Sequence, residues 1–298
     1  MNNIFIFNIA RLAVSSVLNA IAIHPRPGLV TPLEKDALDG TEFPVFLDGA
    51  MGMFPCLVNC ASVGSETEEM NPEDVMTLLR PVGQQGERDI LQATRGRLGF
   101  RGTLFLTGLL AAAAGRLIAQ RRNLTPMALG LTGASFVQGI SERELWPLEN
   151  NSGDEDRTAG ERAYILYGID GCRGEAERRF PLTLRTAGLL QNLEGTHGHL
   201  SLRERAAHVL IHIMVWNADT SLAARGGIDE LLRVQEAARN TLAAGGMLTP
   251  SGREAVNAMD REFRRQGISP RGSTVILSAA FFILALGEMC LTRSGQEE

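Results

Sequence analysis

The amino-acid sequence predicts an all-α protein that forms a single compact multi-helix domain over residues 1–298. Apolar residues recur at helical spacing along almost the whole chain, whereas alternating strand patterns are scarce. Residues that start or stop helices interrupt this pattern at intervals typical of helices of roughly 8–20 residues. With 298 residues, 44% of them hydrophobic, the chain can bury a large core without disulfides or a structural metal.

The boundaries of the predicted helices follow from these start and stop signals. The turn His24-Pro25-Arg26-Pro27-Gly28 ends the first helix, because proline cannot continue it. Asn71 before Pro72 is typical of a helix start, and Ser201-Leu202-Arg203-Glu204 is a capping box. Gly245-Gly246 separates two amphipathic helices. In chain order, the predicted helices are 4–22, one that opens at residue 72, 103–122, 201–216, 228–244, 251–265 and a last one that opens at Gly272-Ser273.

Three segments bear on domain organisation and location. Residues 149–160 (ENNSGDEDRTAG) are polar and acidic, which predicts an exposed loop inside the domain. Residues 4–23 and 275–286 resemble membrane signals, but Arg11 interrupts the first segment. The second segment is shorter than the roughly 20 residues that a transmembrane helix needs. We therefore expect both to be core helices of a soluble, cytoplasmic protein with no membrane partner.

Charge and residue usage narrow the function classes. The formal charge of −5 gives no electrostatic basis for binding nucleic acid. Four scattered cysteines exclude a disulfide framework and a CxxC zinc site. Lys35 is the only lysine among 29 basic residues, so Schiff-base chemistry and a lysine-containing phosphate loop are excluded. Four histidines lie close together in the sequence, but no catalytic glutamate accompanies them as in a zinc-protease motif. A packing role is therefore favoured over metal binding for His197, His199, His208 and His212.

Glycine and arginine coincide repeatedly at predicted helix boundaries. Glycine lets backbone N–H groups approach an anion, a helix N-terminus adds positive potential, and arginine binds phosphate through its planar fork. Together these junctions predict a polyphosphate ligand. The alternative for each single junction is an ordinary helix cap beside an exposed arginine. The candidate phosphate- and nucleotide-binding residues are Arg26, Gly28, Arg101, Gly102, Arg173, Gly174, Arg225, Gly226, Gly227, Arg271, Gly272 and Ser273.

The same segments carry a resemblance to a known family over about residues 20–285. Pro25-Arg26-Pro27-Gly28-Leu29-Val30 is similar to its first motif, P-[KR]-P-G-L-V. Further similar segments follow in the family's order: Gly83…Glu87, Thr94…Gly96…Arg101-Gly102…Phe105, Gly171-Cys172-Arg173-Gly174-Glu175-Ala176…Phe180-Pro181, Asp219-Thr220…Arg225-Gly226-Gly227 and Ile268-Ser269-Pro270-Arg271-Gly272-Ser273. The family is that of the triphosphoribosyl-dephospho-CoA synthases, which make the prosthetic-group precursor of citrate lyase and malonate decarboxylase.

This resemblance implies a transferase that makes 2′-(5-triphosphoribosyl)-3′-dephospho-CoA from ATP and 3′-dephospho-CoA and releases adenine. The attack on the ATP ribose would pass through an oxocarbenium-like transition state, near which carboxylates are useful. Mg²⁺ bound with ATP is the implied cofactor. Glu175, Asp219 and Glu87 occupy matching motif positions and are the predicted catalytic acids, as base or metal ligands. We predict that Glu175 and Arg173 face a common pocket with Asp219 and Arg225.

The chain departs from the family pattern at several polar positions. Histidine, aspartate, asparagine and threonine of the family are replaced by apolar or small residues. Two alternatives therefore stay open: a non-catalytic or repurposed relative that binds a nucleotide or CoA-like ligand, and a ribosyl transferase with a different acceptor. The replacing residues are Leu38, Gly40, Leu98, Gly99, Phe100, Ser221 and Val275.

Overall fold

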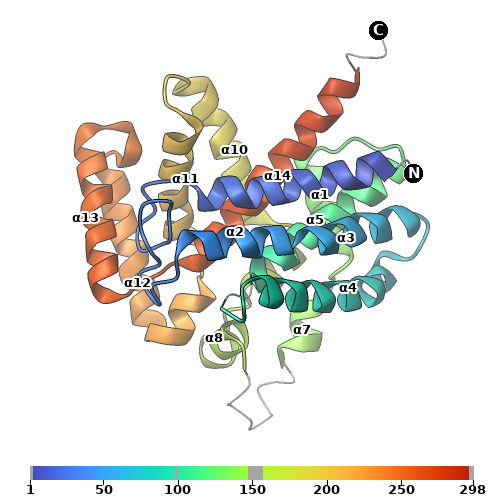
Figure 1. The fold of residues 1–298 in the computed structure, drawn as a ribbon, viewed down its shortest axis with the longest axis horizontal. Coiled ribbons are helices and arrows are strands. Elements are labelled where there is room, and N and C mark those ends of the chain that lie inside the picture. The colour runs from blue at the N-terminus through green and yellow to red at the C-terminus, as the bar shows by residue number, and fades with distance from the viewer. Residues whose placement is uncertain (1–2, 98–99, 147–156, 295–298) are drawn as a thin grey trace.

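The computed structural model describes residues 3–97, 100–146 and 157–294, and all regular structure in these ranges is helical. The predicted all-α fold is therefore confirmed, while most of the predicted acidic loop at 149–160 lies outside the described residues. Figure 1 shows α11, α12 and α13 on one side of the fold and α3 and α4 on the other. The helices are α1 (Asn3–Ile21), α2 (Phe43–Gly52), α3 (Phe54–Glu66), α4 (Pro72–Ala93), α5 (Arg101–Ala119), α6 (Pro126–Ser135), α7 (Ile140–Glu144), α8 (Ala159–Tyr167), α9 (Gly171–Glu177), α10 (Pro181–Thr196), α11 (Leu202–Trp216), α12 (Thr220–Ala243), the short 3₁₀ helix η2 (Gly246–Leu248), α13 (Pro250–Gln266) and α14 (Arg271–Ser294).

Helix α5 corresponds to the predicted helix 103–122, and it begins and ends slightly earlier than expected. Nearly every residue from Thr103 to Leu117 is buried. Helix α3 packs directly on it: a Cβ added at Gly64 would overlap the backbone of Ala112. Small side chains on both helices therefore allow backbone-to-backbone contact at the centre of the fold.

Local signals account for most helix ends. Pro72 opens α4, and Ser201 and Glu204 form the predicted capping box at α11. The expected helix at 228–244 is the second part of α12, which begins at Thr220. It bends at Gly227, whose φ of 74° and ψ of −178° are not helical. Helix α12 therefore carries its kink where the sequence indicated a boundary.

One hydrophobic cluster extends from Ile6 in α1 to Leu286 in α14. Ile9 and Phe282, from the two segments expected to be core helices, are fully buried in it. By length and apolar composition alone, several stretches could cross a membrane. These stretches are residues 4–21, 43–66, 101–119 and 271–289. Between 33% and 78% of each stretch is buried inside the protein.

His208 and His212 form a packed pair on α11. The Nδ1 atom of His208 accepts a hydrogen bond from the Met247 N–H at 3.2 Å, and the two Nε2 atoms lie 3.2 Å apart. Burial, followed by the charges of His212 and His197, lowers the pKa of His208 to about 4. No group of three metal-ligating side chains occurs within the described ranges. His208 and His212 thus pack against each other, and His208 also contacts the backbone of Met247.

The loop at residues 22–42, between α1 and α2, is fixed to the start of α14 by a buried arginine. Arg26 is only 2% exposed and donates to the carbonyl groups of Ile21 at 2.9 Å and Val30 at 2.7 Å. It also donates to the side chain of Thr274 in α14. Burial lowers the pKa of Arg26 to about 9, against the opposing charge of Asp36.

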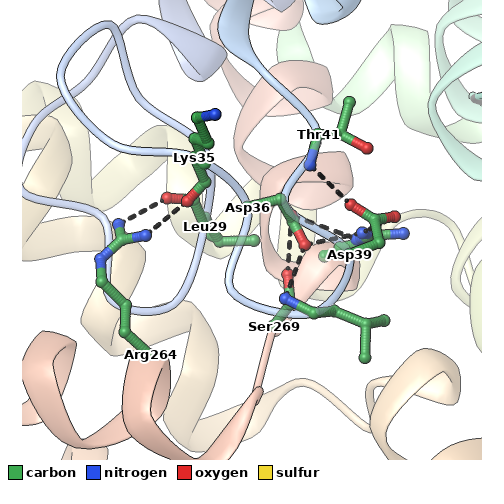
Figure 2. Close-up of polar contacts among 9 residues, drawn as sticks. Leu29, Lys35, Asp36, Asp39, Thr41, Arg264 and Ser269 are labelled. Atoms are coloured by element: carbon green, nitrogen blue, oxygen red, sulfur yellow. Dashed lines mark hydrogen bonds and ion pairs between the residues drawn. The ribbon is translucent and has the colours of Figure 1, made fainter.

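Asp36 completes this attachment from the loop side. Its carboxylate accepts a hydrogen bond from the Ser269 hydroxyl at 3.0 Å (Figure 2). It accepts another from Arg271 at 2.7 Å. Arg264 of α13 donates to the carbonyl of Leu29 at 2.9 Å. We call these contacts between the loop and the α13–α14 segment the clasp. The clasp fixes the position of the first turn of α14.

The Asp36→Ala variant tests the clasp. We expect it to lower the free energy of unfolding by roughly 3 kcal/mol, because Arg271 loses its buried partner and the charge of Arg26 is no longer offset. Asp39→Ala is the matched control, since Asp39 also pairs with Arg271 but 41% of its side chain is exposed. That control should cost less than about 1 kcal/mol. Urea denaturation measures both, and equal losses would contradict the buried role of Asp36.

Candidate functional site

A cavity of about 310 Å³ lies where four helices begin. Gly171, Pro181 and Thr220 are the first residues of α9, α10 and α12, Gly272 is the second of α14, and all four line it. Helix N-termini carry unsatisfied N–H groups and positive potential, so their convergence favours an anionic ligand. The remaining lining residues are Asp170, Cys172, Glu175, Arg178, Leu182, Arg185, Trp216, Asn217, Ala218, Asp219 and Ile276.

Asp219 joins two of these helix starts. It is 2% exposed, and its Oδ1 accepts from the Ser221 N–H at 2.9 Å while its Oδ2 accepts from the Gly272 N–H at 2.8 Å. Burial raises the pKa of Asp219, and these hydrogen bonds oppose the rise. The carboxylate therefore caps α12 and holds the first turn of α14 at the same time.

Glu175 of α9 accepts hydrogen bonds from the start of α10, as Asp219 does from the starts of α12 and α14. It is 7% exposed, and its Oε1 accepts from the backbone N–H of Thr183 at 2.8 Å and from the Thr183 hydroxyl at 2.9 Å. Among the described residues, the Oε2 atom receives only a long hydrogen bond, 3.4 Å from the Leu182 nitrogen. Burial raises the pKa of Glu175 against these hydrogen bonds.

Cys172 lies near both acids. Burial, and then the charges of Glu175 and Asp219, raise the pKa of its thiol to about 12. Such a thiol stays protonated and is a poor nucleophile at neutral pH. Cys172 therefore contributes to the wall of the cavity. The negative charges of both carboxylates, Glu175 and Asp219, act on its sulfur.

The structure brings together Glu175 and Asp219 from the predicted common pocket. Arg173 and Arg225 do not line the cavity and pair with acids elsewhere. Glu87, the third predicted acid, also lies off the cavity and is partly exposed. The ion pairs are Arg173–Glu144 at 2.8 Å, Arg225–Glu230 at 2.5 Å and Arg101–Glu87 at 3.1 Å.

Three charged residues from different helices interact near the start of α5: Glu161 of α8, Arg173 of α9 and Arg101 of α5. Burial alone would raise the pKa of Glu161, but hydrogen bonds from Thr158 and the charges of Arg173 and Arg101 lower it. A Cβ at residue 102 would come within 2.9 Å of the Cys172 sulfur. Gly102 therefore lets the start of α5 approach the cavity wall closely.

Several other predicted site residues pack between helices or take part in the clasp. Gly28 has a φ of 72° and donates its N–H to Asp260 at 2.8 Å, while Arg26 and Arg271 belong to the clasp. Added Cβ atoms at Gly174 and Gly226 would overlap the carboxylates of Asp170 and Glu230 respectively. The hydroxyl of Ser273 is buried and has no hydrogen-bond partner among the described residues.

The positions that depart from the family pattern also have clear surroundings. Ser221 donates its hydroxyl to Asp219 at 2.5 Å, so a polar contact is retained there. Phe100 packs edge-on against Phe46, with ring centroids 6.0 Å apart, and Val275 faces Gly102. Leu38 and Gly40 lie in the clasp loop. Leu98 and Gly99 lie outside the described residues.

The lining residues that sequence reasoning missed include Arg178, Arg185 and Trp216. Arg178 pairs with Asp170, and the guanidinium of Arg185 lies 4.6 Å from the ring centroid of Trp216. One available signal was that Trp216 is one of only two tryptophans and ends a predicted helix. Their proximity to each other comes from the packing of α10 on α11.

The Gly272→Ala variant tests the close approach at the start of α14. The new Cβ would lie 2.8 Å from the Asp219 carboxyl carbon and would break the bond from the residue 272 N–H. We expect a loss of roughly 1–3 kcal/mol in the free energy of unfolding. Gly188→Ala in α10 is the control, because nothing lies within 4 Å and alanine favours a helix. Thermal melts that showed the two variants to be equivalent would contradict the predicted contact.

Comparison with known proteins assigns the chain to a family. A family model described as ATP:dephospho-CoA triphosphoribosyl transferase matches residues 6–293. The 2-(5''-triphosphoribosyl)-3'-dephosphocoenzyme-A synthase of Klebsiella pneumoniae is 35% identical over 274 residues, which cover 91% of this chain and 88% of that protein. A probable synthase of the same description from Citrobacter koseri is 32% identical over 285 residues, covering 94% and 91%. No solved structure matches the chain. As the order of its motifs predicted, the chain belongs to the ATP:dephospho-CoA triphosphoribosyl transferase family.

Proposed function

We propose that this protein transfers the triphosphoribosyl group of ATP to 3′-dephospho-CoA, and that the reaction takes place in the cavity at the four helix starts. The product, 2′-(5-triphosphoribosyl)-3′-dephospho-CoA, is the precursor of a prosthetic group. The observation that carries the proposal is the family match over residues 6–293, which includes every residue that lines the cavity.

The atoms of this reaction define what the site must do. The bond between C1′ of the ATP ribose and adenine N9 breaks, and a bond forms from C1′ to the 2′ oxygen of dephospho-CoA. That hydroxyl loses a proton, and the departing adenine gains one. Positive charge develops at C1′ in the transition state, so an adjacent carboxylate stabilises it.

The hydrogen bonds of the two buried acids support different roles. Glu175 is the proposed base, because within the described part of the chain its Oε2 receives only the 3.4 Å bond from Leu182 and keeps lone pairs for the attacking hydroxyl. Asp219 has one short N–H bond on each oxygen, which fixes it in place to offset charge at C1′. The raised pKa of Glu175 brings this acid closer to the neutral pH at which proton transfer is efficient.

Mg²⁺ is proposed to enter together with ATP. No cluster of three acidic, histidine or cysteine side chains occurs in the described parts of the chain, and both carboxylates above accept backbone N–H bonds. These residues fit an ion carried mainly by phosphate oxygens and water, as Mg²⁺ prefers. Asp170 would be the side chain that approaches such an ion, because it is 23% exposed at the cavity, although Arg178 donates to both of its oxygens. When bound, the ion would neutralise phosphate charge.

Adenine release tests the proposed function. Purified protein incubated with ATP, dephospho-CoA and Mg²⁺ should release adenine and an equal amount of the triphosphoribosylated product, both quantified by liquid chromatography and mass spectrometry. Omission of dephospho-CoA should abolish release. Two results would contradict the proposal: release that requires another acceptor, and nucleotide binding with no release under any condition. The second is the behaviour of a non-catalytic relative.

A further inference from the structure

Arg185 differs from the five arginines that the sequence motifs assign to phosphate. Each of those five is already engaged by carboxylates or, for Arg26, by backbone carbonyls and Thr274. Arg185 lies on α10, four residues after Pro181 at the helix start, and lines the cavity. No carboxylate lies within ion-pair distance of it in the described ranges. The four motif arginines with carboxylate partners are Arg101, Arg173, Arg225 and Arg271.

Arg178 is the other arginine of the cavity, and its charge is neutralised. It donates to both oxygens of Asp170, one of them at 3.0 Å. By contrast, the charge of Arg185 acts on a neighbour: after burial, it is the next cause that lowers the pKa of His212. Among the described residues, the cavity therefore has one uncompensated guanidinium.

Trp216 holds this guanidinium in a defined place. The Arg185 carbon Cζ lies over the indole, 4.6 Å from the ring centroid, and Trp216 is 56% exposed although it lines the cavity. A guanidinium stacked on an aromatic face keeps its edge N–H groups free for an anion. The pair thus presents a preorganised fork of donors beside the start of α10.

We propose that Arg185, positioned by Trp216, binds the triphosphate of ATP during the transfer. This inference rests on the proposed function, which makes ATP the substrate that carries the largest negative charge. An unpaired arginine fork next to the N-termini of α10, α12 and α14 matches a polyphosphate chain in sign and in hydrogen-bond geometry. The diphosphate of dephospho-CoA has the same chemistry and is the alternative source of the anion, which the kinetics below distinguish.

Steady-state kinetics of the Arg185→Ala variant test the assignment. The KM for ATP should rise roughly 10- to 100-fold, while kcat at saturating ATP and the KM for dephospho-CoA stay within about threefold. Arg185→Lys should fall between, because lysine keeps the charge but not the fork. Arg203→Ala is the matched control, since Arg203 is an exposed arginine on α11 that does not line the cavity. A rise in the KM for dephospho-CoA alone would overturn the assignment to ATP.

A binding measurement separates this inference from the proposed function. Trp146→Phe leaves Trp216 as the only tryptophan. In that background, inorganic tripolyphosphate should change the emission of Trp216, and the additional Arg185→Ala substitution should remove the change. This readout requires no turnover, so it stays informative if no adenine is ever released. An unchanged response in the double variant would overturn the role of Arg185.

Variants of Trp216 test its positioning role. Trp216→Phe keeps an aromatic face and should leave the KM for ATP close to the wild-type value. Trp216→Leu removes the face and should raise that KM roughly 3- to 10-fold, with kcat unchanged. A leucine variant with unchanged KM for ATP would show that Arg185 does not depend on the indole.

Discussion

The hydrogen bonds that Asp219 accepts from the starts of α12 and α14 are the constraint on which the rest of the site depends. A buried carboxylate is costly unless N–H donors surround it, and two helix N-termini supply such donors. Glu175 uses the same device at α10, through Thr183. The two acids beside the cavity are therefore positioned by the ends of long helices, which makes their placement rigid.

The clasp supports this arrangement from the opposite end of the sequence. Arg26 and Asp36 hold the first turn of α14 through Thr274 and Arg271, and Gly272 follows Arg271 directly at the point where α14 meets Asp219. Motifs that are far apart along the chain thus act on one helix start. Arg26 and Arg271, which the motifs assigned to phosphate, therefore stabilise the start of α14 and do not line the cavity.

Helix content was predictable because its signals are local, whereas contacts between helices were not. The kink at Gly227 produced the same sequence signal as a helix boundary, so the capping of α12 by Asp219 was missed. Pairing of Arg173 with Glu144 depends on α7 meeting α9, which no motif spacing encodes. Glu175 and Asp219 were predicted because they occupy matching positions in motifs that resemble those of the family. Arg185 was missed because only tertiary packing brings it beside the cavity.

The most direct test of these roles is the rate constant for adenine release at saturating substrates by Glu175→Gln and Asp219→Asn, measured together with ATP affinity. Both amides keep the shape of the side chain, and asparagine still caps a helix well. We predict that each rate constant falls at least roughly 100-fold, as expected for loss of a proton acceptor or a fixed charge, with ATP binding within about threefold of wild type. Wild-type rate constants in folded variants would contradict the assignment of the cavity as the reaction site.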